Sequence, residues 1–211
     1  MANPLPVLVR LHLTGLRVLL VFTVVCGLAY PLLITGIAQL AFSHQANGSQ
    51  LKQGGRVVGS DLLGQSFDLP KKNPADPNEQ AQPDPRWFQP RPSAAGAGYD
   101  PTASGASNLG PNSADLLKAV QARRAAVAAF DGVAPGRVPP DALTASGSGL
   151  DRDISPAYAE EQVDRVAKAR GLDPDRVRQL VADHRTGRTL GFLGDPRVDV
   201  LALNLALARQ G

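Results

Sequence analysis

The serine-rich segment TASGSGL, residues 144–150, contains the residues of this chain whose types come nearest to a catalytic site. Ser146 or Ser148 could act as a nucleophile if His184 supplied the general base and an aspartate oriented it. A nucleophile elbow, however, has glycines two residues before and two residues after its serine, whereas Ser148 has a glycine directly on each side. His184 is expected at the C-terminal end of a helix, where a histidine complements the helix dipole. The sequence therefore predicts no catalytic residue.

Nucleotide and metal chemistry have little support in the sequence. The segment SGASN, residues 104–108, offers small residues and backbone amides, but the phosphate-binding pattern GxxxxGK[ST] does not occur. The three histidines are far apart and Cys26 is the only cysteine, so there is no zinc-ligand spacing and no disulfide framework. We expect no metal site and no firmly bound cofactor. Docking against a partner is the simplest explanation for two loops so rich in turn-forming residues.

These loops belong to a chain that begins with a long apolar run. Residues 18–42 contain no charge, and the run exceeds the roughly 20 residues that a helix needs to cross a bilayer. A secretory signal has a shorter apolar region of about 7–15 residues, so we expect a retained transmembrane helix. Arg10 and Arg17 precede the run, and Lys52 is the first cation after it. Because cations near a membrane tend to stay cytoplasmic, we expect a cytoplasmic N-terminus and an exported C-terminal domain.

The composition divides the chain into one membrane anchor and one soluble domain. The expected regions are a cytoplasmic N-terminus at 1–17, a transmembrane helix at 18–42, the start of the soluble domain at 43–69, a polar loop or insertion at 70–85, and the main body at 86–211. The formal net charge is +3, and because Arg10 and Arg17 precede the helix, the exported part is nearly neutral. This balance gives no argument for binding nucleic acid.

Local patterns predict that the exported part is a mixed α/β domain of the α+β class. Val57 and Val58 favour a short strand, whereas 43–55 is typical of a flexible exit from the membrane. The segment around Trp87 and Tyr99 lacks periodicity, so we expect an ordered loop docked by its aromatic rings. Residues 200–210 alternate leucine, but the interleaved alanines favour a helix over a strand. Helices are also expected where a capping residue precedes a helical repeat, at 113–130, 155–170 and 173–184.

Four motifs follow one another along the loops and the closing segment: RPSA at 91–94, SGASNLGP at 104–111, TASGSGLD at 144–151 and LGFLGDPRVDVLALN at 190–204. In this order, after a single N-terminal span, they resemble the C subunit of Kdp-type potassium-transporting ATPases over nearly the whole chain. The family's SGGSN, DPHIS and VNVL are altered here, by Ala106, by Arg152 with Asp153, and by Asp199. The acidic insertion at 76–84 is also longer than usual.

The resemblance implies a non-catalytic accessory subunit of an ATP-driven, high-affinity potassium uptake complex in the bacterial inner membrane. The implied partners are a potassium-selecting channel-like subunit, a P-type ATPase subunit and a small single-span subunit. The implied roles are assembly and stability of the complex, together with action as a catalytic chaperone that raises the ATP affinity of the ATPase subunit. An exported domain does not meet cytoplasmic ATP, so the charge distribution argues against direct nucleotide contact.

The resemblance also points to candidate contact residues, toward a partner or a nucleotide, in the motif loops: Arg91, Ser93, Ser104, Gly105, Ser107, Asn108, Thr144, Ser146 and Ser148. Aspartates in or beside these loops could enrich cations at the mouth of the potassium-selecting subunit, or could cap turns and helices: Asp100, Asp141, Asp151, Asp153 and Asp199. The alternative class is a membrane-anchored extracytoplasmic hydrolase or ligand-binding module, which would work without partner subunits.

Overall fold

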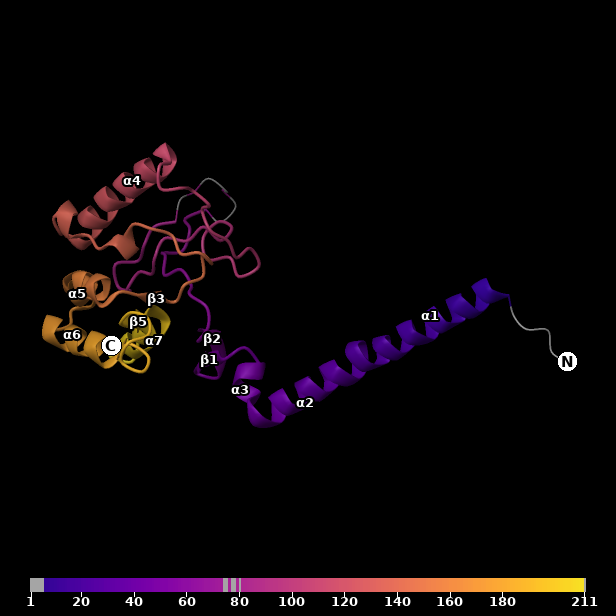
Figure 1. Ribbon diagram of the computed structural model, residues 1–211. Coiled ribbons are helices and arrows are strands. Elements are labelled where there is room, and N and C mark those ends of the chain that lie inside the picture. The colour runs from indigo at the N-terminus through magenta and orange to yellow at the C-terminus, as the bar shows by residue number, and fades with distance from the viewer. Residues whose placement is uncertain (1–5, 74–75, 77–78, 80, 211) are drawn as a thin grey trace. The chain divides into compact units, whose positions relative to one another are not determined.

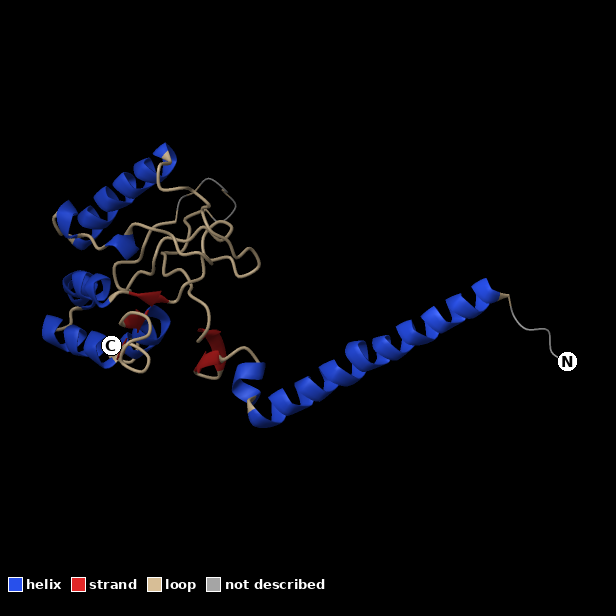
Figure 2. Ribbon diagram, viewed as in Figure 1, coloured by secondary structure: helices blue, strands red, loops and turns tan. Residues whose placement is uncertain are grey.

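The computed structural model describes residues 6–73, 76, 79 and 81–210, in two compact units that divide between Gln50 and Leu51. Figure 1 labels the elements along the chain, and Figure 2 separates helices, strands and loops by colour. The first unit is helical, with α1 at Val7–Val24, a π-helical turn at Val25–Ala29, α2 at Tyr30–Ala41 and α3 at Ser43–Ala46.

One continuous helix in the first unit is long and apolar enough to cross a membrane. It runs from Val7 to Ala41, and its most apolar window has a mean hydropathy of 2.4 and no buried residue. At about 1.5 Å per residue, its 35 residues measure about 52 Å, whereas the hydrocarbon core is about 30 Å thick. The helix therefore begins before the apolar run at 18–42, and its first turns, which carry Arg10 and Arg17, exceed what spanning requires.

The helix changes from α to π geometry just before Pro31. Pro31 has no backbone N–H, so the carbonyl four residues earlier, at Gly27, lacks its regular partner. A π-helical turn at Val25–Ala29 occupies this position, and the Tyr30 N–H donates to the Val25 carbonyl. The irregularity of the helix therefore has a local covalent cause.

The segment after the apolar helix is more regular than the sequence predicts. The expected flexible exit at 43–55 is wrong, because α3 forms one turn and β1, Gln50–Gln53, pairs with β2, Arg56–Ser60. Gly54 and Gly55 have φ values of 57° and 79°, which is the left-handed backbone that a two-residue hairpin turn requires. The strand expected from Val57 and Val58 is confirmed as part of β2.

The second unit is a mixed helix and sheet domain, as predicted. A three-stranded antiparallel sheet has the order β3–β5–β4, with β3 at Asp153–Ile154, β5 at Arg197–Asp199 and β4 at Arg185–Thr186. Single turns of 3-10 helix occur at Pro135–Arg137 and Pro140–Ala142. The longer helices are α4 at Ala114–Asp131, α5 at Pro156–Arg170, α6 at Pro174–Asp183 and α7 at Val200–Leu207.

The helix boundaries follow the predicted capping residues closely. The side chains of Ser113, Ser155 and Asp173 each accept a hydrogen bond from a backbone N–H in the first turn of the next helix. Gly171, with φ of 66°, ends α5 in the left-handed conformation. The closing segment forms α7, so the preference for a helix over a strand is confirmed.

The core lies among α5, α6, α7 and the central strand β5, and it also receives Phe88 from the loop between β2 and α4. Trp87 is partly buried against Phe67, with ring centroids 6.2 Å apart. The prediction that aromatic rings dock this loop is therefore confirmed. Among the described residues, the apolar side chains larger than alanine that have no exposed surface belong to Phe88, Val163, Val166, Val177, Val198, Leu203 and Leu207.

The polar segment at 70–85 is irregular where the structure describes it; residues 74–75, 77–78 and 80 lie outside the described part. Its last residues are anchored, which the sequence does not predict. Asp84 is buried and accepts from the Arg86 guanidinium at 2.7 Å, and this hydrogen bond holds the pKa of Asp84 below its usual range. The Leu69 N–H donates to the Gln82 carbonyl at 2.8 Å, which closes the base of the segment.

Candidate functional site

The structure brings together two loops that carry the sequence motifs: the first motif loop, residues 91–111, and the second motif loop, residues 144–151. The Gly105 N–H and the Ser104 hydroxyl both donate to the Ser148 carbonyl, at 2.8 and 2.9 Å. The Ser93 hydroxyl donates to the Gly149 carbonyl at 2.6 Å. Segments about 50 residues apart in sequence are thus cross-linked by hydrogen bonds, and four predicted site residues lie at the junction.

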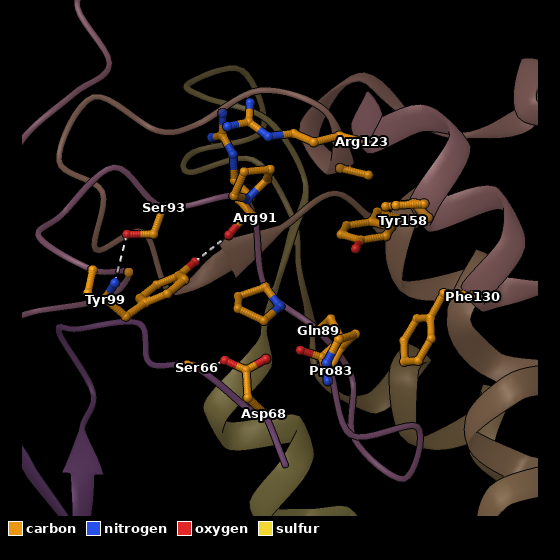
Figure 3. A pocket seen from close by; sticks show the side chains of 17 residues that line it. Ser66, Asp68, Pro83, Gln89, Arg91, Ser93, Tyr99, Arg123, Phe130 and Tyr158 are labelled. Atoms are coloured by element: carbon orange, nitrogen blue, oxygen red, sulfur yellow. Dashed lines mark hydrogen bonds between the residues drawn. The ribbon is translucent and has the colours of Figure 1, made fainter. Parts of the chain in front are cut away.

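Ser93 organises the start of the first motif loop. Besides its bond to Gly149, its hydroxyl oxygen accepts from the Ala95 N–H at 3.1 Å and the Tyr99 N–H at 2.8 Å. The Tyr99 hydroxyl in turn donates to the Arg91 carbonyl at 2.8 Å, as Figure 3 shows. Ser93 is therefore a positioning residue inside the loop, with its hydrogen-bonding capacity used by the protein itself.

Arg91 connects the two motif loops from the other side. Its guanidinium forms an ion pair with Asp151 at 2.9 Å and donates to the Thr144 carbonyl at 3.3 Å. The pair is partly buried, which strengthens it relative to a fully exposed ion pair. Arg91 and Asp151 thus fix the ends of the second motif loop against the first.

Gly149 is the point of closest approach between the loops. Its φ of 68° lies in the left-handed region, and a Cβ there would meet the Ala95 nitrogen and the Gly105 carbonyl oxygen, both at 2.7 Å. Only glycine satisfies both conditions without displacing backbone. In the sequence Gly149 stands out only as the neighbour of Ser148, because its close contacts are with segments remote in the chain.

The serines of the second motif loop act as acceptors for backbone amides. The Ser146 oxygen accepts from the Gly149 N–H at 2.9 Å, and the Ser148 oxygen accepts from the Leu150 N–H at 3.0 Å. The His184 Nδ1 lies 2.8 Å from the Leu180 carbonyl. Within the described residues neither serine forms a hydrogen bond with a histidine, so this arrangement builds a loop and does not form a nucleophile–base pair.

Two predicted site residues, Ser107 and Asn108, face solvent on the first motif loop. Their side chains form no hydrogen bond with any part of the chain that the structure describes. Asn108 has φ of 54°, a conformation that asparagine tolerates better than most residues. The exposed Thr144 is different, because its hydroxyl donates to the Pro140 carbonyl at 3.0 Å. Ser107 and Asn108 are the site residues with free polar side chains.

A pocket of about 330 Å³ lies between the first motif loop and α4. Figure 3 shows Asp68, Arg91 and Tyr99 toward one side of it and Phe130 and Tyr158 toward the other. Burial raises the pKa of both tyrosines above the ordinary value of 10.0, at which the hydroxyl is already neutral at physiological pH. Proline, alanine and valine side chains complete the wall together with the polar Ser66, Gln89, Ser93 and Arg123. These groups are suited to binding; they do not supply an activated nucleophile.

The aspartates beside the motif loops are engaged within the domain. Asp100, Asp151 and Asp199 each accept a backbone N–H a few residues later in the chain. Asp141 accepts from the Ser155 N–H and hydroxyl, and Asp153 pairs with Arg197 at 3.1 Å. Capping and pairing therefore describe these five residues, and the expectation of a cation-enriching set is not supported by their geometry.

Arg152 and Asp199, two residues expected to depart from the motifs that the sequence resembles, contact each other. The Arg152 guanidinium lies 3.2 Å from the Asp199 carboxylate and 2.7 Å from the Asp61 carboxylate. Asp199 also caps α7, a role that asparagine fills equally well. Arg152, Asp199 and Asp61 thus form a local ion-pair cluster beside the paired strands β3 and β5.

Comparisons with known proteins show the family to which the sequence belongs. Residues 12–209 match the family model KdpC, described as K+-transporting ATPase, c chain. A potassium-transporting ATPase KdpC subunit from Kineococcus radiotolerans is 58% identical over 200 residues, covering 95% of this chain and 94% of that protein.

Two further relatives have the same name. The protein from Streptomyces coelicolor is 51% identical over 210 residues, covering 94% of this chain and 92% of its own length. The protein from Mycobacterium tuberculosis is 47% identical over 201 residues, covering 95% and 98%. With the match to the family model over almost its whole length, this chain belongs to the KdpC family of potassium-transporting ATPase c chains.

Proposed function

We propose that this chain is a non-catalytic accessory subunit of an ATP-driven potassium transporter, anchored in the bacterial inner membrane by the helix Val7–Ala41. The N-terminus is cytoplasmic and the second unit is periplasmic. Its partners are the potassium-selecting channel-like subunit, the P-type ATPase subunit and the small single-span subunit. Family membership, the names of the relatives and the apolar helix with Arg10 and Arg17 at its start support this proposal.

One structural observation carries the proposed partner contact. Ser107 and Asn108 have free, exposed polar side chains, yet their loop is fixed to the second motif loop through Ser104 and Gly105. Because the loop is ordered before binding, a partner that hydrogen-bonds these side chains loses little conformational entropy. The contact face consists of these residues with the exposed Thr144 and Ser148 on the second motif loop.

In this proposal the contact face rests on the outer mouth of the potassium-selecting subunit and holds the subunits together. Of the aspartates near the loops, Asp151, Asp153 and Asp199 have their charge offset by arginines, and in this proposal they have no part in attracting ions. A periplasmic domain does not touch ATP. Any effect of this subunit on the ATP affinity of the complex is then transmitted through the membrane-spanning subunits.

Variants of Asn108 test the contact face. Asn108→Gly removes the side chain but keeps the left-handed backbone available, and we expect about a tenfold lower recovery of the complex on a tagged ATPase subunit. Thermal unfolding of the detergent-solubilised chain should not change. Asn112→Ala, an exposed asparagine outside the contact face, is the matched control. Full recovery of the complex from Ser107→Ala/Asn108→Gly would refute the contact.

Cysteine labelling tests the orientation, because the single native cysteine lies inside the apolar helix and can be replaced by alanine. A cysteine at Asn112 should react with a membrane-impermeant maleimide in spheroplasts, whereas a cysteine at Val7 should react only after lysis. The reverse pattern would place the domain in the cytoplasm and would favour direct contact with the nucleotide.

A further inference from the structure

An exposed hydrophobic hairpin end, here called the apolar tip, connects β4 to β5 and consists of residues 189–193, with the sequence TLGFL. Leu190, Phe192 and Leu193 are 80%, 69% and 50% exposed. None of these three side chains belongs to the hydrophobic core of the domain. Large exposed apolar groups that are gathered within four residues mark an interaction site more often than isolated ones do.

The backbone of the apolar tip is closed by its own hydrogen bonds. Thr189 and Leu193 exchange two bonds, N–H to carbonyl in each direction, both at 2.9 Å. The Gly191 N–H donates to the Arg188 carbonyl at 3.1 Å, and the Phe192 N–H donates to the Thr189 carbonyl at 3.3 Å. A loop whose amides are paired internally can enter an apolar environment without leaving these donors unsatisfied.

The backbone of the tip also includes an unfavourable left-handed conformation at a residue other than glycine. Leu190 has φ of 54°, in the left-handed region that a leucine side chain disfavours. Gly191 within the tip and Gly194 directly after it are also left-handed, with φ of 84° and 72°. The tip is mounted on β5, the central strand of the sheet, whose Val198 is fully buried. Its shape is therefore defined by the fold.

Charges lie at the base of the tip and not within it. Arg188 and Asp195, one on each side of the hairpin, form an ion pair at 3.2 Å. The uncharged side chains of the tip thus lie next to an ion pair whose charges cancel. Interface hot spots have a similar arrangement, with an apolar centre and polar residues around it.

We propose that the apolar tip inserts into an uncharged, apolar cleft on another subunit of the transporter; this inference rests on the proposed function. The defined shape favours a protein partner over lipid, because a fluid bilayer accepts any apolar shape and does not require a strained Leu190. Charge complementarity favours an uncharged cleft, since Arg188 and Asp195 already neutralise each other. The tip is then a second anchor of this subunit, separate from the contact face on the motif loops.

The first test measures assembly with variants that preserve the fold. Leu190→Asn suits the left-handed backbone, and Phe192→Gln removes the ring without touching the core. We expect the double variant to lower recovery of the complex on a tagged ATPase subunit by about tenfold, with thermal unfolding of the chain unchanged. Leu117→Gln, an exposed leucine on α4, is the matched control and should assemble normally.

The outcomes separate this inference from the proposed function. If the wild-type chain does not co-purify with the other subunits, the proposed function fails. If the wild-type chain and the double variant both co-purify fully, only the apolar tip is excluded as an anchor.

The second test identifies what covers the tip. Phe192→p-benzoylphenylalanine, activated by light in the purified complex in lipid nanodiscs, should cross-link to another transporter subunit, and the same residue at Leu117 should not. Cross-links to lipid, to a second copy of this chain, or to nothing would each overturn the proposal.

Discussion

Asn204 and Phe88 form two reciprocal hydrogen bonds although 116 residues separate them in the sequence. The Phe88 N–H donates to Asn204 Oδ1 and Asn204 Nδ2 donates to the Phe88 carbonyl, both at 2.9 Å. Gln162 and Gln89 repeat the arrangement at 2.6 and 3.1 Å. The side-chain amides of Asn204 and Gln162 thus pair with the backbone N–H and carbonyl of Phe88 and Gln89, as a neighbouring β-strand would. The irregular segment at Phe88 and Gln89 is therefore buried with its backbone groups hydrogen-bonded. These pairs fix the chain immediately before Arg91.

Replacing Asn204 should therefore destabilise the domain. In Asn204→Leu the N–H and carbonyl of Phe88 stay buried without partners, and we expect the free energy of unfolding to fall by about 3 kcal/mol. Urea unfolding of the detergent-solubilised chain, followed by fluorescence of Trp87, measures the change. Asn112→Ala, an exposed asparagine, should leave the midpoint where it is. Equal stability of Asn204→Leu and the wild type would show that the reciprocal bonds contribute nothing.

The close approach at Gly149 gives a second prediction. Gly149→Ala places a Cβ 2.7 Å from two backbone atoms and forces a left-handed alanine, so it should cost about 2–4 kcal/mol of unfolding free energy. Gly147→Ala is the matched control, because a Cβ there meets nothing within 4 Å. The same urea titration measures both variants. If the two alanine variants were equally stable, the junction between the motif loops would not be as tight as the structure indicates.

A buried ion pair beside the segment that contains Pro85 and Trp87 gives a third prediction. Arg165 pairs with Asp131 at 2.6 Å and donates to the carbonyls of Pro85 and Trp87 at 2.7 and 2.9 Å. Arg165→Met leaves a buried carboxylate without its partner, which should cost about 3–5 kcal/mol.

A double-mutant cycle separates the pair from the carbonyl contacts. Asp131→Leu/Arg165→Met should lose less stability than the sum of the two single variants, because no charge stays buried alone. Strict additivity of the two changes in unfolding free energy would contradict an energetic coupling between Arg165 and Asp131.

The structural features that could be predicted from the sequence have local causes. The starts of α4, α5 and α6 could be predicted from their capping residues, Ser113, Ser155 and Asp173. In each case the capping side chain and the amide that it caps are two or three residues apart. The same locality explains why the apolar helix could be predicted, since its length and composition alone set it apart.

The missed features depend on contacts between distant segments. Arg165 is a charged residue of the kind that usually lies on the solvent-exposed face of a helix. The packing of α4 against α5 brings Asp131 next to it. In the sequence Gly149 is indistinguishable from other loop glycines. The fold places Ala95 and Gly105 against it, and this contact requires glycine. Ser93 and Ser146 are singled out by the motifs that contain them. Their role as hydrogen-bond acceptors for backbone amides of the motif loops depends on the fold.

The carboxyl groups of Glu161 and Asp131 predict a pH-dependent stability. Burial, and then the neighbouring Asp131 carboxylate, raise the pKa of Glu161 to about 7, against the lowering effect of Arg137. Because this pKa in the folded state exceeds the unfolded value near 4.5, the folded state binds more protons between these pH values. The stabilising contribution is complete below about pH 4.5 and is lost as the pH rises through about 7.

Glu161→Gln, which mimics the protonated carboxyl, should flatten this dependence. Thermal unfolding of the solubilised chain between pH 5 and 8, on the order of three pH units around the shifted pKa, should show a smaller decline for the variant than for the wild type. Glu160→Gln is the control, because Glu160 is exposed and pairs with Arg178 on the surface; it should keep the wild-type decline. If Glu161→Gln and the wild type declined in parallel, the proton would reside elsewhere and Asp131 would be the next group to replace.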